Sequence, residues 1–250
     1  MRVAAIYDVH GNLPALEAVL DQIRQAEVDS VLVGGDVLPG PMPRETLERL
    51  RNLDIPVRCI HGNGEVAVLD QMAGKEPTGF PEPFRPVIRW TAEQLSSKHQ
   101  RWLSAWPKTV RLQIDGLGEV LFCHATPRSE NEIFTTRTPE ERLLPIFEGL
   151  SASVVVCGHI HMQFDRRIGT TRVVNAGSVG MPFGDPGAYW AVLGPDVQFR
   201  HTLYDFTHAA ERIRVAGSPQ AEQFATHNVL QPPSQSEMLE VFTRAEARAI

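Results

Sequence analysis

The sequence predicts an α/β fold with two β-sheets, and two features of its pattern lead to this prediction. The first third of the chain alternates short apolar runs with helix-like segments, the order of a parallel sheet with crossover helices. From Val110 onward the pattern is mostly short strands separated by turn residues, which predicts a second, antiparallel or mixed sheet. Of the 250 residues, 42% are hydrophobic and 22% are charged, so a disordered or fibrous chain is excluded.

The first sheet is expected to form from three strands joined by two helices. In chain order we expect a strand at residues 3–7, a helix at 13–23, a strand at 30–33, a helix at 44–53 and a strand at 56–60. In the first helix Leu13, Leu16 and Leu20 recur three and four residues apart, which is the spacing of one helix face. The order βαβαβ predicts that the three strands run parallel.

The middle of the chain changes character. Residues 73–86 contain four prolines and two glycines, which predicts a loop, and two helices are expected after it at 87–96 and 98–105. The strands of the second half are expected at residues 110–114, 119–123, 153–157, 166–169, 172–175, 189–193 and 197–203, with one helix at 139–150.

The C-terminal tail predicts two more helices. One covers residues 207–215, and the other follows Pro232-Pro233, where Ser234 and Glu237 have the spacing of a capping box. The second helix carries an apolar stripe of Met238, Val241, Phe242 and Ala245. We therefore expect a main domain at residues 1–205 and a C-terminal helical extension at 206–250 that packs on the same domain.

Charge and cysteine content exclude several classes of protein. The formal net charge of −6 argues against general nucleic-acid binding, although it permits a small anionic substrate at a metal site. The three cysteines are odd in number and lie in apolar runs, so we expect reduced thiols. The chain has no stretch resembling a signal peptide, and no run approaches the ~20 apolar residues of a membrane span. These features predict a cytoplasmic protein without membrane association.

Five of the expected strands end at residues that can bind metal ions. In chain order, the runs end at Asp8 with His10 two residues on, at Asp36, at Asn63, at His124, and at His159 with His161 two residues on. Ligands bind at the carboxyl ends of strands in open α/β sheets. The pattern therefore predicts one polar site built from all seven side chains.

The chemistry of these side chains indicates two divalent ions. Carboxylate, amide and imidazole groups together suit divalent ions, with Mn as the first choice and Fe, Ni, Co, Zn or Mg as alternatives. Seven ligands are too many for one ion but suit two ions that share a carboxylate. Two ions about 3.5–4 Å apart are a common device for in-line displacement at phosphorus, because they activate a water and neutralise phosphoryl oxygens.

These motifs resemble those of the calcineurin-like metallophosphoesterase superfamily, and are most similar to its small prokaryotic phosphodiesterase-like members. The matching segments are Asp8-Val9-His10-Gly11-Asn12, Gly34-Gly35-Asp36, Gly62-Asn63, His124, Gly158-His159-Ile160-His161 and Asn175-Ala176-Gly177-Ser178. The resemblance implies a four-layer α-β-β-α sandwich of two mixed sheets, with the metal site at the carboxyl ends of the strands.

The resemblance also implies a role for each ligand. Asp8, His10 and His161 would hold the first metal, and Asp36 would bridge the two. Asn63, His124 and His159 would hold the second. The catalytic residues are then Asp36, Asn63 and His124, which act through a metal-held hydroxide that attacks phosphorus in line. Asn12 is expected either to bind a phosphoryl oxygen of the substrate or to hold its loop.

One position departs from the family pattern. Many members have a histidine directly after the Gly-Asn pair, usually assigned as proton donor to the leaving group, and this chain has Gly64 there. A general acid contributes about 10²–10⁴-fold to the rate. The departure therefore favours phosphodiesters or phosphoanhydrides with acidic leaving groups. We further expect Gly64→His to raise activity toward monoesters. His61 is expected either to pack against the neighbouring loop or to serve as an alternative donor.

The expected function is hydrolysis of a small phosphate ester or nucleotide, at phosphodiester or phosphoanhydride bonds. The alternatives are a phosphomonoesterase or protein phosphatase, a dinucleoside polyphosphate hydrolase, and a non-catalytic scaffold of the same fold. All seven ligand positions hold competent ligands, which favours an enzyme over a scaffold. The pattern predicts no particular oligomeric state.

Overall fold

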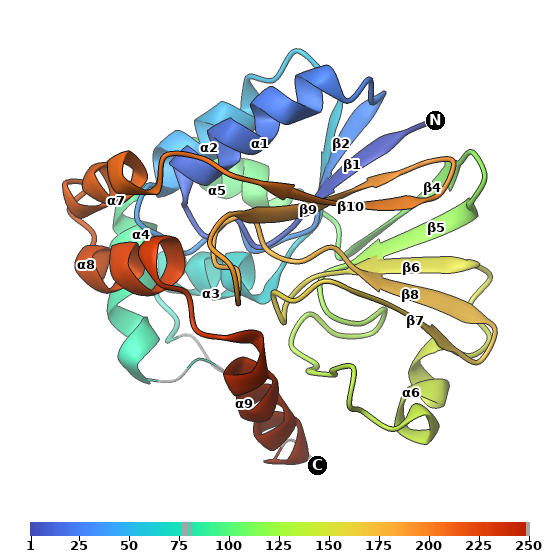
Figure 1. The fold of residues 1–250 in the computed structure, drawn as a ribbon. Coiled ribbons are helices and arrows are strands. Elements are labelled where there is room, and N and C mark those ends of the chain that lie inside the picture. Colours follow the sequence, from blue (N-terminus) through green and yellow to red (C-terminus); the bar gives the residue numbers. More distant parts are fainter. Residues whose placement is uncertain (77–79, 81, 249–250) are drawn as a thin grey trace.

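The computed structural model describes residues 1–76, 80 and 82–248, and it contains two five-stranded sheets packed face to face (Figure 1). The first sheet has the spatial order β10 (Val197–Thr202), β9 (Ala188–Leu193), β1 (Val3–Ile6), β2 (Ser30–Val33) and β3 (Val57–Cys59). The second sheet has the order β4 (Thr109–Ile114), β5 (Gly118–Cys123), β6 (Val154–Cys157), β8 (Thr171–Asn175) and β7 (Phe164–Ile168).

Both sheets are mixed. Strands β1, β2 and β3 run parallel, as do β5, β6 and β8, while the remaining strands pair antiparallel. The expectation that residues 189–193 and 197–203 join the second sheet is wrong, because β9 pairs with β1 and β10 pairs with β9. Five of the six β9 residues are buried, so this apolar run fits the interior of the first sheet beside β1.

The core lies in three apolar layers, which separate four layers of backbone. Alternate residues of a strand face opposite sides of its sheet. In β1, Ala4 and Ile6 face α1 (Leu13–Gln25), whereas Val3 and Ala5 face the second sheet. The outer face of the second sheet packs on α6 (Glu140–Phe147) through residues such as Phe147. The α-β-β-α sandwich is therefore confirmed.

Helices of the first half follow the predicted order with two differences. They are α2 (Pro43–Arg51), α3 (Asn63–Met72), α4 (Arg85–Gln94) and α5 (Ser97–Ser104). Helix α3 was not predicted, since its first turn contains Gly64, a weak helix former. The loop expected to end at residue 86 gives way earlier, to the 3₁₀ turn Glu82–Phe84 and then α4. Proline is tolerated in a first helical turn. Residues 77–79 and 81 of that loop lie outside the described residues.

The tail forms α7 (Phe206–Arg214), α8 (Ala221–Phe224), the π-helix Ala225–Leu230 and α9 (Gln235–Arg248). The predicted capping box at α9 is confirmed, because Ser234 N donates to Glu237 Oε2 at 3.0 Å and Glu237 N donates to Ser234 Oγ. Helix α9 packs Met238, Leu239 and Phe242 against the third apolar layer, and Val241 is exposed. The domain boundary at residue 205 stays a prediction. In the described part of the chain, no helix has the length and apolarity that a bilayer span requires.

Candidate metal centre

The seven predicted ligands lie at the ends of five strands, in the loops or helix that follow them. Asp8 and His10 follow β1, Asp36 follows β2, and Asn63 is the first residue of α3 after β3. His124 follows β5, and His159 and His161 follow β6. Among the described residues the structure groups six of these as Asp8, His10 and His161, and as Asp36, His124 and His159. The ligand atoms of each group lie within 4.8 Å of one another.

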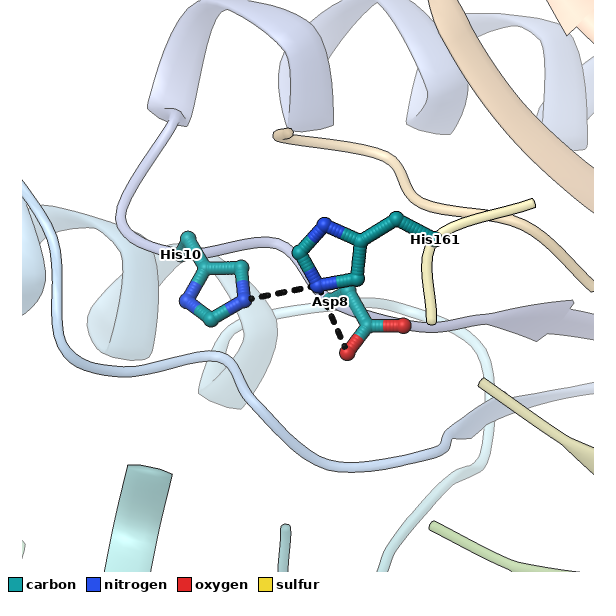
Figure 2. A group of neighbouring side chains, drawn as sticks. All are labelled: Asp8, His10 and His161. Carbon is teal, nitrogen blue, oxygen red and sulfur yellow. Dashed lines mark hydrogen bonds and ion pairs between the residues drawn. The ribbon is translucent and has the colours of Figure 1, made fainter. Parts of the chain in front are cut away.

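The first group points its ligand atoms at a common point (Figure 2). His161 Nε2 lies 3.4 Å from Asp8 Oδ1 and 3.3 Å from His10 Nε2. His10 Nδ1 faces the Pro39 carbonyl and His161 Nδ1 faces the Met181 carbonyl, at 3.3 and 2.7 Å. A carbonyl only accepts, so each Nδ1 donates a proton and Nε2 is the ring nitrogen left for a metal ion. A metal ion would bind each Nε2 in its deprotonated form.

The second group has the same design. His124 Nδ1 donates to the Gly34 carbonyl at 2.9 Å, which directs Nε2 toward Asp36 Oδ1 at 3.5 Å. Asn63 joins this group, since its Oδ1 lies 3.0 Å from His124 Nε2. The two remaining buried ligand atoms, Asp8 Oδ1 and His159 Nε2, have no hydrogen-bond partner. An unpaired buried polar atom is costly, and coordination of a metal ion would satisfy both.

Asp36 connects the two groups. Its Oδ2 lies 3.7 Å from His10 Nε2 of the first group, and its Oδ1 lies 3.5 Å from His124 Nε2 of the second. The Asp36 carboxylate therefore lies between the two groups, and its role as a bridge between two ions stays a prediction.

Backbone strain is concentrated in the ligands. Asp8, His10, Asp36, His159 and His161 have φ angles of 52°, 46°, 50°, 69° and 58°. Glu27 is the only other non-glycine residue with positive φ in the described chain. This left-handed conformation costs about 1–3 kcal/mol per residue and persists where surrounding contacts enforce it. At these strand ends the left-handed conformation bends the loops sharply and directs the ligand side chains toward one site.

Burial and mutual charge shift the pKa values of the ligands. Burial raises the pKa of Asp8 and Asp36, but the nearby His161 and His124 outweigh it, so both pKa values fall below the ordinary range. Burial lowers the pKa of His124, but the Asp36 carboxylate outweighs it and raises that pKa to about 10. Burial and His124 lower the pKa of His159 to about 4. The site thus holds ionised carboxylates in a buried setting, where a cation neutralises them.

The packing around position 64 explains why this residue is glycine. Its main-chain N–H donates to Asp36 Oδ1 at 2.7 Å. A Cβ atom at this position would lie 1.9 Å from the Leu38 carbonyl oxygen and 3.0 Å from Asp36 Oδ1. The expectation that Gly64→His adds a proton donor is therefore withdrawn, because the backbone of the neighbouring loop occupies the space that any side chain needs.

Glu65 is a residue of the site that sequence reasoning missed. It is fully buried, and its carboxylate accepts from the main-chain N–H groups of Asp36, Leu38 and Gly62 at 2.9, 3.0 and 2.8 Å. Burial and the Asp36 carboxylate raise the pKa of Glu65 to about 7. Glu65 thus ties the loop after β2 to the start of α3. Its place three residues after Gly62, at a helix start, is a capping pattern that offered a signal.

Asn12 and His61 are engaged elsewhere. Asn12 is fully buried, its Oδ1 accepts from Ala15 N, and its Nδ2 donates to the Gly180 carbonyl. Asn12 thus holds its loop and caps α1, as the alternative expected, and its contact with a substrate stays a prediction. His61 Nε2 donates to the Leu103 carbonyl at 2.7 Å, so the His61 side chain is bonded to the last turn of α5.

The segment Asn175-Ala176-Gly177-Ser178 supports the site from behind. Asn175 Nδ2 donates to the Gly158 carbonyl, beside His159. Ser178 Oγ donates to the Asp8 carbonyl at 2.8 Å and accepts from Met181 N. This segment therefore fixes the backbone of ligands from both sheets.

Residues 1–196 match the family model of the calcineurin-like phosphoesterase superfamily domain. The chain belongs to this superfamily. An uncharacterised protein of Methanocaldococcus jannaschii, MJ0912, is 29% identical over 164 residues, which is 65% of this chain and 63% of that protein. The calcineurin-like chain thus spans less than two thirds of that relative.

Two solved structures are similar to this calcineurin-like protein. A metallophosphoesterase from Sphaerobacter thermophilus has a TM-score of 0.69 and 29% identity, with 90% of this chain and 97% of that chain covered. The hypothetical protein PH1004 from Pyrococcus horikoshii has a TM-score of 0.77 and 21% identity, with 93% and 99% covered. The second likeness shows the shared fold.

Proposed function

We propose that this protein is a metal-dependent phosphoesterase that hydrolyses phosphodiester or phosphoanhydride bonds of a small substrate. One observation carries the proposal. The Asp36 carboxylate lies between the two ligand groups, and within these groups the buried atoms Asp8 Oδ1 and His159 Nε2 have no hydrogen-bond partner. The residues present therefore fit two divalent ions.

In this proposal Asp8, His10 and His161 hold the first ion, Asn63, His124 and His159 hold the second, and Asp36 bridges. Two such ions, when bound, supply an activated water and neutralise the charge of phosphoryl oxygens. The carbonyls of Pro39, Gly34 and Met181 fix the protons of His10, His124 and His161 on Nδ1 and keep each Nε2 free to bind.

The leaving group is constrained by what surrounds Gly64. No side chain fits at position 64. The candidate donor His61 uses its Nε2 to bond the Leu103 carbonyl. Without a positioned acid at residue 64, leaving groups that need little protonation react fastest. This supports diesters and anhydrides, including dinucleoside polyphosphates, over alkyl monoesters.

We also propose Mn as the ion and the cytoplasm as the location.

The test is a panel of metals against substrates. Purified protein loaded with Mn²⁺, Fe²⁺, Co²⁺, Ni²⁺, Zn²⁺ or Mg²⁺ is assayed with bis(4-nitrophenyl) phosphate, 4-nitrophenyl phosphate, cyclic nucleotides and a dinucleoside tetraphosphate. The proposal expects two ions per chain, and diester or anhydride hydrolysis above monoester hydrolysis. Asp36→Asn should abolish activity, and the exposed Asp54→Asn is the matched control.

The alternatives give different results in the same panel. Faster hydrolysis of 4-nitrophenyl phosphate than of the diester would favour a phosphomonoesterase or protein phosphatase. A folded protein that binds none of the six ions and cleaves no substrate would be a scaffold, and the proposed function would be wrong.

A further inference from the structure

A single loop, residues 178–184, connects the first metal group to the C-terminal helix. At its start, Ser178 Oγ donates to the Asp8 carbonyl. In its middle, the Met181 carbonyl accepts from His161 Nδ1 at 2.7 Å. The loop therefore contacts two of the three ligands proposed for the first ion.

Phe183 of this loop stacks on the imidazole of His161. The two ring centroids are 5.4 Å apart and the planes differ by 18°. Phe183 is 6% exposed, so it is packed from the other side as well. A hydrogen bond at Nδ1 holds the imidazole at one edge, and the flat face of Phe183 limits its rotation about that edge. Together these contacts direct Nε2 toward Asp8 Oδ1.

Helix α9 and its leading residues hold Phe183 in place. The Phe242 ring centroid lies 6.0 Å from that of Phe183, with the planes at 53°. Gln235 Nε2 donates to the Phe183 carbonyl at 3.3 Å, and Gly184 N donates to the Pro233 carbonyl at 2.9 Å. The peptide group that follows Phe183 is thus hydrogen-bonded to residues 233–235 through both its carbonyl and its N–H.

The far end of α9 is anchored independently. Glu246 is buried, it accepts from Thr138 Oγ1 at 2.8 Å, and it pairs with Arg142 of α6 at 3.1 Å. The helix is therefore held at its last turns while Phe242 contacts Phe183. The family match ends at residue 196, so α9 lies outside the matched domain.

We infer that Phe183 and Phe242 are positioning residues, through which α9 fixes the orientation of His161 and sets the affinity of the first metal group. This inference rests on the proposed function only in requiring that His161 binds a metal ion. It assigns to the C-terminal extension a role in the metal centre beyond its packing on the domain.

The experiment is calorimetric titration of the full chain with Mn²⁺, in a ligand-free buffer after chelation. Phe183→Ala should raise Kd at the first group about tenfold, the lower end of what loss of an orienting contact to a metal ligand costs. Phe242→Ala should act in the same direction by a smaller factor, and Phe242→Tyr should retain most of the wild-type affinity. Val241→Ala, an exposed position on the same helix, is the matched control.

A double-mutant cycle assigns the effect to His161. Phe183→Ala should weaken binding in a His159→Ala background, where the first group is intact, and should change nothing further in a His161→Ala background. Equal weakening in both backgrounds, or unchanged Kd in Phe183→Ala and Phe242→Ala, would overturn the inference. Phe242 is only half-buried, so its variants keep the test decisive if Phe183→Ala does not fold.

Failure of the proposed function gives a separate result. Wild-type protein that binds no Mn²⁺ at either group would overturn both proposals. Wild-type binding with no selective effect of Phe183 or Phe242 would overturn the positioning role alone.

Discussion

The main-chain N–H of Gly64 donates to Asp36 Oδ1 at 2.7 Å, and this contact places α3 directly against the carboxylate shared by the two ligand groups. The residue that replaces the usual family histidine thus holds Asp36, the carboxylate proposed to bridge two ions, through its backbone. This close approach requires glycine at position 64, because a Cβ atom there would lie 1.9 Å from the Leu38 carbonyl oxygen.

Gly64→Ala is therefore expected to damage the metal centre. Relief of the contact with Leu38 must move α3 or the loop after β2, and either shift displaces Asp36. We expect a lower Tm and a Kd for Mn²⁺ raised at least tenfold, with Gly64→His giving no gain in monoester hydrolysis. Gly74→Ala is the control, since it has open space around it and only the cost of its positive φ, about 1–2 kcal/mol. Wild-type Mn²⁺ affinity in Gly64→Ala would contradict the steric argument.

Glu65→Gln should destabilise the chain. The carboxylate accepts three main-chain N–H groups, whereas an amide turns an N–H₂ group toward at least one of them. An unsatisfied buried donor costs about 1–3 kcal/mol, measured as a lower urea midpoint of the metal-free protein. The exposed Glu93→Gln should leave the midpoint unchanged. Equal midpoints for the two variants would show that Glu65 does not tie these loops.

Removal of metal should lower the melting temperature. An ion that binds only the folded chain stabilises it by about 2.7 kcal/mol at a concentration of 100 Kd. We expect MnCl₂ to raise Tm by several degrees and EDTA to reverse the rise, as followed by differential scanning calorimetry. Asp8→Asn should lose much of this response, and Asp54→Asn should keep it. A Tm that does not respond to any divalent ion would argue against the site.

Glu132 should give a pH-dependent contribution to stability. Burial raises its pKa, but hydrogen bonds from Arg128 and Thr126 outweigh this and hold the pKa below the ordinary value. A lowered pKa means that the ionised form stabilises the fold, above the unfolded pKa of about 4.3. Glu132→Gln should thus cost at most about 1 kcal/mol at pH 7, since the pair is partly exposed. The difference should vanish as pH falls through the folded pKa, and a constant difference would refute this assignment.

The ligands could be predicted from sequence because their signal is local. Asp8, Asp36 and His124 each end an apolar run, and the carboxyl ends of neighbouring parallel strands meet at one edge. The location of β9 was not predicted because the sequence of an apolar strand does not indicate which strand it pairs with. Val3 and Leu193 pair although 190 positions separate them (193 − 3), and hydrophobic pattern alone does not specify that choice.

Residues that support the ligands were harder to predict. Glu65 accepts main-chain N–H groups from Gly62 and from the loop after β2. Its spacing from Gly62 is a capping pattern, but nothing near it in sequence reveals the contact with the loop after β2. Phe183 resembles any apolar residue until its stacking on His161 is seen. Such residues depend on long-range packing, which the sequence pattern specifies only through the complete fold.

The pairing of β1 with β9 has a consequence for the order in which the protein matures. The strand that delivers Asp8 and His10 is made first, but its antiparallel neighbour emerges from the ribosome only after residue 188. Until then β1 is an edge strand with unpaired main-chain groups, and contacts of such long sequence separation form slowly. The nascent chain therefore completes its first sheet late, only after the β9–β10 hairpin has been synthesised.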